Sequence, residues 1–224
     1  MLNGWLLFKR ASGDSSVQAT FFTREQGMIS CLCKGWRAAK KKSILQAFVP
    51  LWLSIDERRE WYYARRIEFS GPILELQGQA LFSGLYVNEL LYHALKPLDP
   101  AIKLYDAYQQ TLMSLTCIHQ DKMALEAVLR RFECILLEAC GYAVSFAEEA
   151  GTLKAIKPGS FYQYVAGEGF YPAAQGIDGS YLLALAENNL ECAETLRIAK
   201  YIMRKAISHL FDGREIKSRA LFQS

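Results

Sequence analysis

The residues best suited to chemistry lie in one positively charged loop, residues 34–42. In this loop Trp36 is surrounded by five cations: Lys34, Arg37, Lys40, Lys41 and Lys42. Such cations can neutralise phosphates while an exposed indole offers a nucleic-acid base a stacking surface. The alternative is a solvated loop whose charge keeps a sheet edge from pairing. The first interpretation predicts that Trp36 is exposed.

Two adjacent arginines, Arg130 and Arg131, form a second candidate site. They lie beside the apolar stripe of a segment whose apolar residues recur at helical spacing. One interpretation is an anion contact next to an apolar groove, which would suit an acidic peptide with a hydrophobic end. The other is an ordinary surface ion pair, because Glu126 precedes Arg130 by one helical turn.

The net charge of +3 is unevenly distributed along the chain. Residues 1–78 carry +5 and the remainder carries −2, yet within that remainder residues 197–219 carry +5. This second basic region includes Arg204, Lys217 and Arg219. Two basic regions separated by a neutral-to-acidic middle predict a polyanionic partner that is contacted at two places.

The sequence lacks the common motifs for catalysis, metal binding and membrane insertion. It has no G-x-S-x-G, no Walker loop and no G-x-G-x-x-G, and no local motif pairs a nucleophile with a base. Its six cysteines show no C-x-x-C spacing, and its three histidines lie far apart. No apolar run approaches the roughly 20 residues of a membrane span, and the N-terminus does not read as a signal peptide. We therefore expect a non-enzymatic cytoplasmic protein with reduced cysteines and without metal or cofactor.

These candidate residues must be positioned by elements that the sequence pattern predicts. The composition, 51% hydrophobic and 22% charged, is near the globular average and excludes a disordered tail, a collagen-like repeat and a coiled coil. Five strands are expected in the first seventy residues: Gly4–Arg10, Val17–Thr23, Met28–Lys34, Leu45–Ile55 and Glu60–Phe69. Five short strands joined by tight turns indicate a small barrel, for which an OB-fold and a small SH3-like barrel are both candidates.

After Gly71-Pro72 the spacing of apolar residues becomes helical. Helices are expected over residues 81–91, Ala101–Leu115, Leu125–Ala139, Ser180–Glu187 and Glu194–Leu210. Gly141 stands where a left-handed residue would end the third of these helices. The Gly-rich, aromatic stretch 141–178 predicts an irregular hairpin with short strands at Phe161–Val165 and Gly169–Pro172. The predicted fold is α+β, with a five-stranded OB-fold barrel domain, residues 1–78, followed by a mainly α-helical domain, residues 79–224.

Several segments occur in an order and at intervals typical of one protein family. They are Thr23-Arg24-Glu25-Gln26-Gly27, followed by a strand and Lys34-Gly35; Leu45-Gln46-Ala47-Phe48-Val49-Pro50-Leu51; Tyr86-Val87-Asn88-Glu89-Leu90-Leu91; Leu129-Arg130-Arg131-Phe132-Glu133, with Leu136-Leu137 and Gly141-Tyr142; and Lys217-Ser218-Arg219 before Leu221-Phe222. With these segments the chain resembles the bacterial RecO recombination and repair proteins over nearly its whole length.

The resemblance implies an OB-fold followed by a helical domain, and a role in DNA repair and recombination without a cofactor-dependent active site. RecO-like proteins bind single- and double-stranded DNA and anneal complementary strands. With RecR they help RecA displace the single-strand-binding protein SSB at the nucleoid, in a pathway that also includes RecF. The alternative function is a non-catalytic adaptor that holds protein partners without binding DNA.

The resemblance also implies roles for particular residues. Lys34 and Arg37 match DNA-binding cations of the family, with Lys40, Lys41 and Lys42 as neighbours. Arg130, Arg131 and apolar neighbours such as Leu136 lie in the region that, in the family, is near the pocket for the acidic, Phe-ended tail of SSB. Some members carry a four-ligand zinc knuckle, but residues 143–193 here contain only Cys192, so we expect no zinc.

Overall fold

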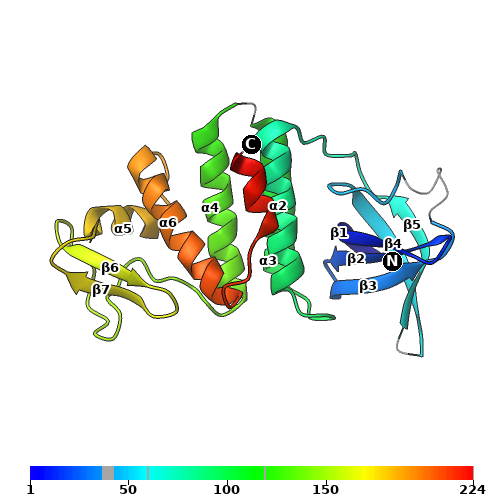
Figure 1. The fold of residues 1–224 in the computed structure, drawn as a ribbon, viewed down its shortest axis with the longest axis horizontal. Coiled ribbons are helices and arrows are strands. Elements are labelled where there is room, and N and C mark those ends of the chain that lie inside the picture. The colour runs from blue at the N-terminus through cyan, green and yellow to red at the C-terminus, as the bar shows by residue number, and fades with distance from the viewer. Residues whose placement is uncertain (37–42, 60, 119, 224) are drawn as a thin grey trace. The chain divides into compact units, whose positions relative to one another are not determined.

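The computed structural model describes residues 1–36, 43–59, 61–118 and 120–223. The chain forms two compact units, one of Met1–Cys117 with Ile216–Ser224 and the other of Ile118–Glu215. The first unit holds a β-barrel, two helices and the C-terminal segment, and the second holds three helices and a small sheet (Figure 1). Among the described residues, no helix has the length and apolar character needed to cross a membrane.

Five strands form a closed barrel in the order β1-β2-β3-β5-β4. Their bounds are β1 Leu2–Ser12, β2 Ser16–Thr23, β3 Gly27–Cys33, β4 Pro50–Arg58 and β5 Trp61–Phe69. The β3–β5 pair is parallel and the other pairs are antiparallel. Every second side chain points inward, so Phe21, Cys31 and Leu53 fill the barrel. The predicted five-stranded, OB-like barrel and the α+β class are confirmed.

One predicted strand begins later than expected. The strand predicted over Leu45–Ile55 starts at Pro50, and the residues before it form turns in which Phe48 has φ +62°. The apolar residues that suggested a strand, Leu45 and Val49, are buried in the barrel core from these turns. Burial of a turn therefore produced the same pattern as burial of a strand.

Two helices, α2 Gly78–Ala94 and α3 Ile102–Cys117, belong to the same compact unit as the barrel. Outward-facing aromatic residues of the barrel meet them, since the rings of Trp5 and Tyr108 lie 5.8 Å apart, edge to face. Asn88 of α2 joins three elements, because its amide donates to the Leu6 carbonyl and its oxygen accepts from the Tyr108 hydroxyl at 2.6 Å. This packing extends the unit well beyond residue 78.

The C-terminal segment is the short 3-10 helix η1 Lys217–Gln223, which packs on α2. The Glu89 carboxylate caps its start by accepting from the backbone amides of Lys217 and Ser218 at 2.9 and 2.8 Å. Phe222 lies edge to face against the Phe82 ring, 6.2 Å away. The segment from Ile216 onward thus completes a unit whose other part ends at Cys117.

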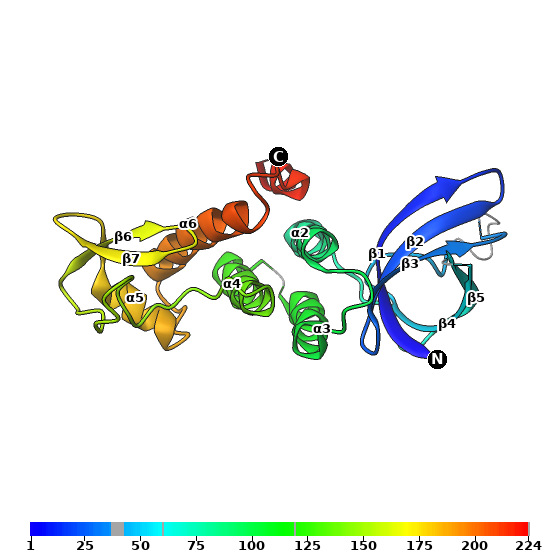
Figure 2. The same ribbon diagram turned by 90° about the horizontal axis from the view of Figure 1, so that it is seen from below.

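The second unit consists of α4 Lys122–Ala139, α5 Gly179–Ala186 and α6 Ala193–Leu210, with a three-stranded sheet of β6 Phe161–Val165, β7 Gly169–Ala173 and β8 Ile177–Asp178 (Figure 2). The predicted end of α4 is confirmed, because Gly141 has φ +81° and the amides of Gly141 and Tyr142 donate to Glu138 and Leu137. The predicted β6–β7 hairpin is present, and α4 packs against α6.

Candidate functional site

The described part of the basic loop begins at Lys34, where β3 ends. Its ammonium group lies 5.0 Å from the centre of the Tyr63 ring on the neighbouring strand β5. This cation–π contact fixes a positive charge over an aromatic face on the outside of the barrel. Arg37, Lys40, Lys41 and Lys42, which complete the predicted site, lie outside the described residues.

The expectation that Trp36 is exposed is wrong. Its side chain is 6% exposed and packs in the barrel core with Cys33 and Leu45. Although Trp36 lies three residues after the end of β3 and beside charged residues, its large apolar ring is buried with the barrel core. The indole therefore stabilises the fold and offers no stacking face to a base.

Two other tryptophans of the barrel, Trp61 and Trp52, are exposed to solvent. Trp61 is 63% exposed and Trp52 is 37% exposed, on β5 and β4. In the register of this hairpin Arg58 pairs with Trp61, and alternation places Trp52, Arg58, Trp61 and Tyr63 on the outward side. We call these four residues with Lys34 the outer face of the barrel. Alternation from the buried Leu53 would have identified Trp52 and Arg58. It would have missed Trp61 and Tyr63, because the β4–β5 register skips Arg65 and so reverses the alternation along β5.

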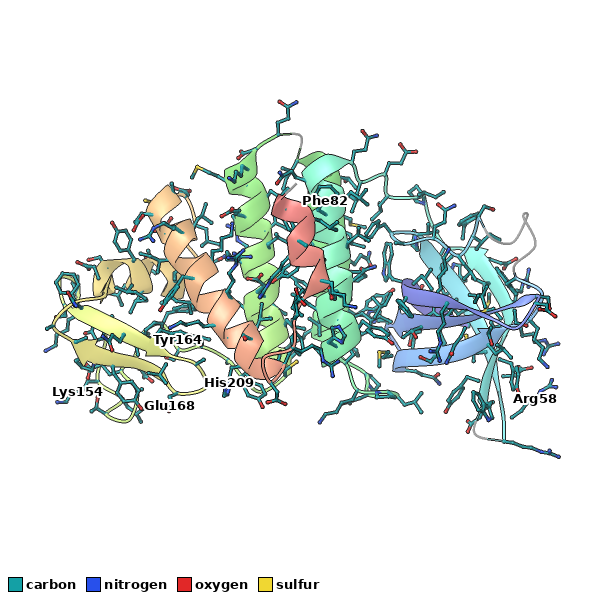
Figure 3. The ribbon with its side chains drawn as sticks, viewed as in Figure 1. Arg58, Phe82, Lys154, Tyr164, Glu168 and His209 are labelled. Carbon is teal, nitrogen blue, oxygen red and sulfur yellow. The ribbon has the colours of Figure 1, made fainter. Side chains whose placement is uncertain are left out.

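The arginines of this hairpin are exposed and only weakly engaged. Arg58 lies 3.6 Å from Asp56 and Arg66 lies 2.8 Å from Glu68, and both guanidinium groups are largely in solvent. Arg58 extends from the end of the β4–β5 hairpin (Figure 3). An exposed ion pair stabilises a protein by at most about 1 kcal/mol. A DNA phosphate can therefore compete with the carboxylates of Asp56 and Glu68 for these arginines.

The arginine pair of α4 borders a cavity of about 530 Å³ in the second unit. Most of its wall is apolar and comes from α4, from the segment after Gly141 and from α5 and α6. The residues that line it include Arg130, Arg131, Ile135, Leu137, Val144, Phe146, Leu185, Asn188, Leu190 and Met203. The predicted combination of arginines and an apolar groove is therefore present in the fold. Two of the four wall segments, α5 and α6, are remote in sequence from α4, so sequence spacing could not identify them.

Arg130 is held in a way that differs from the expected surface pair. Its side chain is 7% exposed and its Nη2 donates to Glu133 at 2.6 Å, whereas Glu126 instead accepts from Lys200 at 2.7 Å. The expected Glu126–Arg130 pair is wrong because Arg130 points into the packed side of α4. Its Nε and Nη1 make no hydrogen bond within the described residues. Arg130 therefore lines the cavity as one member of a buried ion pair, and these two nitrogens are themselves buried.

Arg131 and Leu136 differ in their access to this cavity. Arg131 is exposed at the rim, where its Nε donates to the Asn188 side chain at 3.2 Å. Leu136 is 0% exposed and does not line the cavity, so the expectation that it contacts a ligand is wrong. The apolar neighbours that line it are Ile135 and Leu137, one position to either side.

The second basic region, residues 197–219, is divided between the two units. Arg204 is exposed on α6 of the second unit, and Lys217 is exposed on η1 of the first. Arg219 is half-buried, with its guanidinium 5.8 Å from the centre of the Tyr86 ring. Arg219 therefore packs against α2, so Arg204 and Lys217 are the accessible ones among these three predicted contacts. Across the described ranges, no three His, Cys, Asp or Glu side chains gather as metal ligands would.

Comparison with known proteins matches the two parts of the chain to two models of one family. Residues 2–72 match "Recombination protein O N terminal" and residues 75–219 match "Recombination protein O C terminal". The chain is 53% identical to the DNA repair protein RecO of Legionella pneumophila strain Philadelphia 1, over 99% of this chain and 96% of the relative. It is 37% identical to DNA repair protein RecO of Methylococcus capsulatus, over 99% and 92% of the two chains. The chain belongs to the RecO family of DNA repair proteins.

Proposed function

We propose that this protein is a non-catalytic recombination mediator that binds single- and double-stranded DNA and anneals complementary strands, including strands coated by SSB. An annealing protein must neutralise the repulsion between two phosphate backbones while leaving the base edges free to pair. Lysines and arginines that follow the backbone, with occasional stacking, meet this requirement.

The observation that carries the DNA part of the proposal is the outer face of the barrel. It presents the exposed ring of Trp61 beside Arg58, and Lys34 over Tyr63, within one hairpin and its neighbouring strand. Lys40, Lys41, Lys42 and Arg37 would continue this positive charge from the end of β3. Arg204 and Lys217 are proposed as further DNA contacts because both are exposed cations.

The cavity beside α4 supports binding of the SSB C-terminal tail. An acidic peptide that ends in an aromatic residue could place its ring in the apolar cavity and its carboxylates on Arg130 and Arg131. Arg131, exposed at the rim, is the cation best placed to pair with a carboxylate of such a peptide, and Arg130 forms part of the cavity wall. Family membership alone supports the further proposal that the protein acts with RecR to load RecA, in a pathway that includes RecF.

The decisive experiment measures annealing of two complementary oligonucleotides, bare and coated with SSB, with and without the protein. Acceleration on both substrates would support DNA handling and the SSB contact together. Acceleration only on bare strands would support DNA binding and would contradict the proposal that the α4 cavity binds the SSB tail. An absence of acceleration on either substrate would favour the protein adaptor.

Two charge reversals separate the proposed sites. Replacing Lys40, Lys41 and Lys42 by Glu should weaken DNA binding and reduce the slope of log affinity against log salt by about 2, because each phosphate contact on a single strand contributes about 0.7.

Arg131→Glu should weaken binding of the SSB tail and leave affinity for bare DNA nearly unchanged. Lys122→Glu is the matched control, since it makes the same change of charge on α4 away from the cavity. Equal loss of both activities in Arg131→Glu would make Arg131 a DNA or folding residue.

A further inference from the structure

One face of α6 carries a row of four side chains, each four residues from the next: Arg197, Tyr201, Lys205 and His209. This spacing places them on the same side of the helix. The first three line a cavity of about 520 Å³, and Lys205 and His209 line an adjoining one of about 620 Å³. Tyr164 of β6 lines both cavities, and Tyr164 and His209 are marked in Figure 3. We call this continuous feature the α6 groove.

The α6 groove combines aromatic surface with positive charge. Tyr201 is 46% exposed, and the Lys205 ammonium lies 4.7 Å from the centre of its ring. Arg197 pairs with Glu194 three residues earlier, and the two side chains are 71% and 40% exposed. Because exposed pairs of this kind are weak, a phosphate can displace the carboxylate. Asp212, at the far end, is the acidic residue that lines the groove itself.

The dimensions and chemistry of the groove fit an unpaired nucleic-acid strand. From Arg197 to His209 the helix rises about 18 Å, which spans several nucleotides. Tyr164 is buried at 6% exposure and forms part of the groove wall, so Tyr201 provides the exposed ring. A tyrosine face can stack on any base, but only when that base is unpaired, whereas the basic side chains bind phosphate irrespective of sequence.

We propose that the α6 groove is a second single-strand binding site, carried by the Ile118–Glu215 unit and additional to the outer face of the barrel. The proposal rests on the proposed annealing function and specifies how one chain could hold two strands. When one protein chain binds a DNA strand at each of two sites, the two strands are held close together. Each strand then experiences a higher effective concentration of the other, which favours annealing.

An acidic peptide is less suited to the α6 groove than to the cavity beside α4. The groove presents the exposed ring of Tyr201 and two long basic side chains, whereas the α4 cavity is walled by Ile135, Leu137 and Met203. A hydrophobic peptide end gains most where such aliphatic residues enclose it. Successive bases gain most from flat aromatic faces.

The test uses the full-length protein and a variant with Tyr201→Ala and Lys205→Gln. Both positions are exposed, so the fold should be retained, and circular dichroism checks this. The control is Lys154→Gln, which removes one exposed charge from the same unit outside the groove. Binding of a labelled oligonucleotide is measured on free protein and on protein already saturated with a second, non-complementary oligonucleotide. The groove variant should bind the first strand within about twofold of wild type and lose about tenfold in affinity for the second.

Crosslinking tests the same inference without any variant. An oligonucleotide carrying 5-iodouracil, irradiated on wild-type protein, should crosslink to Tyr201, as identified by mass spectrometry of the peptides. Unchanged second-strand affinity in the variant, or crosslinks confined to the barrel, would overturn the groove site and leave the proposed function intact. Failure of wild-type protein to bind any oligonucleotide would instead remove the proposed function. If the SSB tail peptide occupies Tyr201 and the oligonucleotide does not, the groove is a peptide site and the inference is wrong.

Discussion

Arg24 and Asp106 form a two-pronged ion pair that joins the β2–β3 turn to α3. The Nε and Nη2 atoms of Arg24 each lie 3.1 Å from a carboxylate oxygen of Asp106. Beside this pair the Leu98 amide donates to the Met28 carbonyl at 3.0 Å. The segment Thr23–Gly27, one of the segments that carry the family resemblance, therefore docks the barrel against its helices. Its role in this fold is structural.

Gly27 is the position in this junction that tolerates substitution least. It has φ +70°, and a Cβ atom there would lie 2.1 Å from the Asp99 carbonyl oxygen. Gly27→Ala should therefore prevent normal docking of the 97–100 segment and destabilise the first unit severely. Gly13→Ala is the control, since Gly13 has φ +62° with no atom within 4 Å of a Cβ, and should cost about 1–2 kcal/mol. Urea unfolding measures both, and equal losses would show that backbone strain alone decides the effect.

The Tyr108 hydroxyl should make a measurable contribution to stability. It donates to the buried Asn88 side chain, and burial raises the pKa of Tyr108, so the phenol is a donor at neutral pH. Tyr108→Phe leaves the Asn88 oxygen without this donor and should lower the free energy of unfolding by about 1–3 kcal/mol. The exposed Tyr92→Phe should change it by less than about 0.5 kcal/mol. Thermal and urea unfolding provide the comparison.

Docking of η1 should depend on pH through Glu89. Partial burial raises the pKa of this carboxyl, but hydrogen bonds from Ser218 and Lys217 and the nearby His93 lower it more, so it falls below its ordinary value of 4.5. Ionised Glu89 thus stabilises η1 fully above about pH 4.5, and the contribution is lost as the pH falls through the lowered value. Hydrogen exchange of the Lys217 and Ser218 amides should show protection at neutral pH that is lost in acid.

The matching variant tests the same contact at neutral pH. Glu89→Ala should expose the two amides to exchange at every pH, whereas Glu75→Ala, an exposed carboxylate in the same unit, should leave their protection unchanged. Protection that persists in Glu89→Ala would mean that Phe222 packing alone holds η1.

Tryptophan fluorescence should report DNA binding through the outer face of the barrel. Trp5 and Trp36 are buried at 2% and 6% exposure, whereas Trp61 is 63% exposed. Quenching by an oligonucleotide should largely disappear in Trp61→Phe, and Trp61→Ala should weaken binding by about 1–3 kcal/mol if the indole stacks on a base. Trp52→Phe serves as a comparison on the same face. Full quenching in Trp61→Phe would place the stacked base elsewhere.

Features set by local periodicity could be predicted from the sequence, whereas features decided by tertiary packing could not. Alternation located the barrel strands, and Gly141 marked the end of α4 because a left-handed residue is needed there. The charged neighbours of Trp36 in the sequence predict exposure to solvent, whereas tertiary packing buries its ring in the barrel core. The Arg130 pairing was misjudged because helical spacing permits both Glu126 and Glu133, and only the packing around α4 selects Glu133. The α4 cavity depends on segments up to 73 positions apart, from Arg130 to Met203, which no local pattern connects.

The docking of η1 on α2 also bears on how the protein matures during synthesis. The first unit contains Met1–Cys117 but also Ile216–Ser224, so its last piece is translated after the whole second unit. At roughly 5–20 residues per second, about 5–20 s separate the two parts on the ribosome. During that interval Phe82 and Tyr86 lack the cover of Phe222. Until η1 has left the ribosome, a nascent chain therefore lacks the Phe222 contacts with these two rings, which leaves aromatic surface that chaperones can recognise.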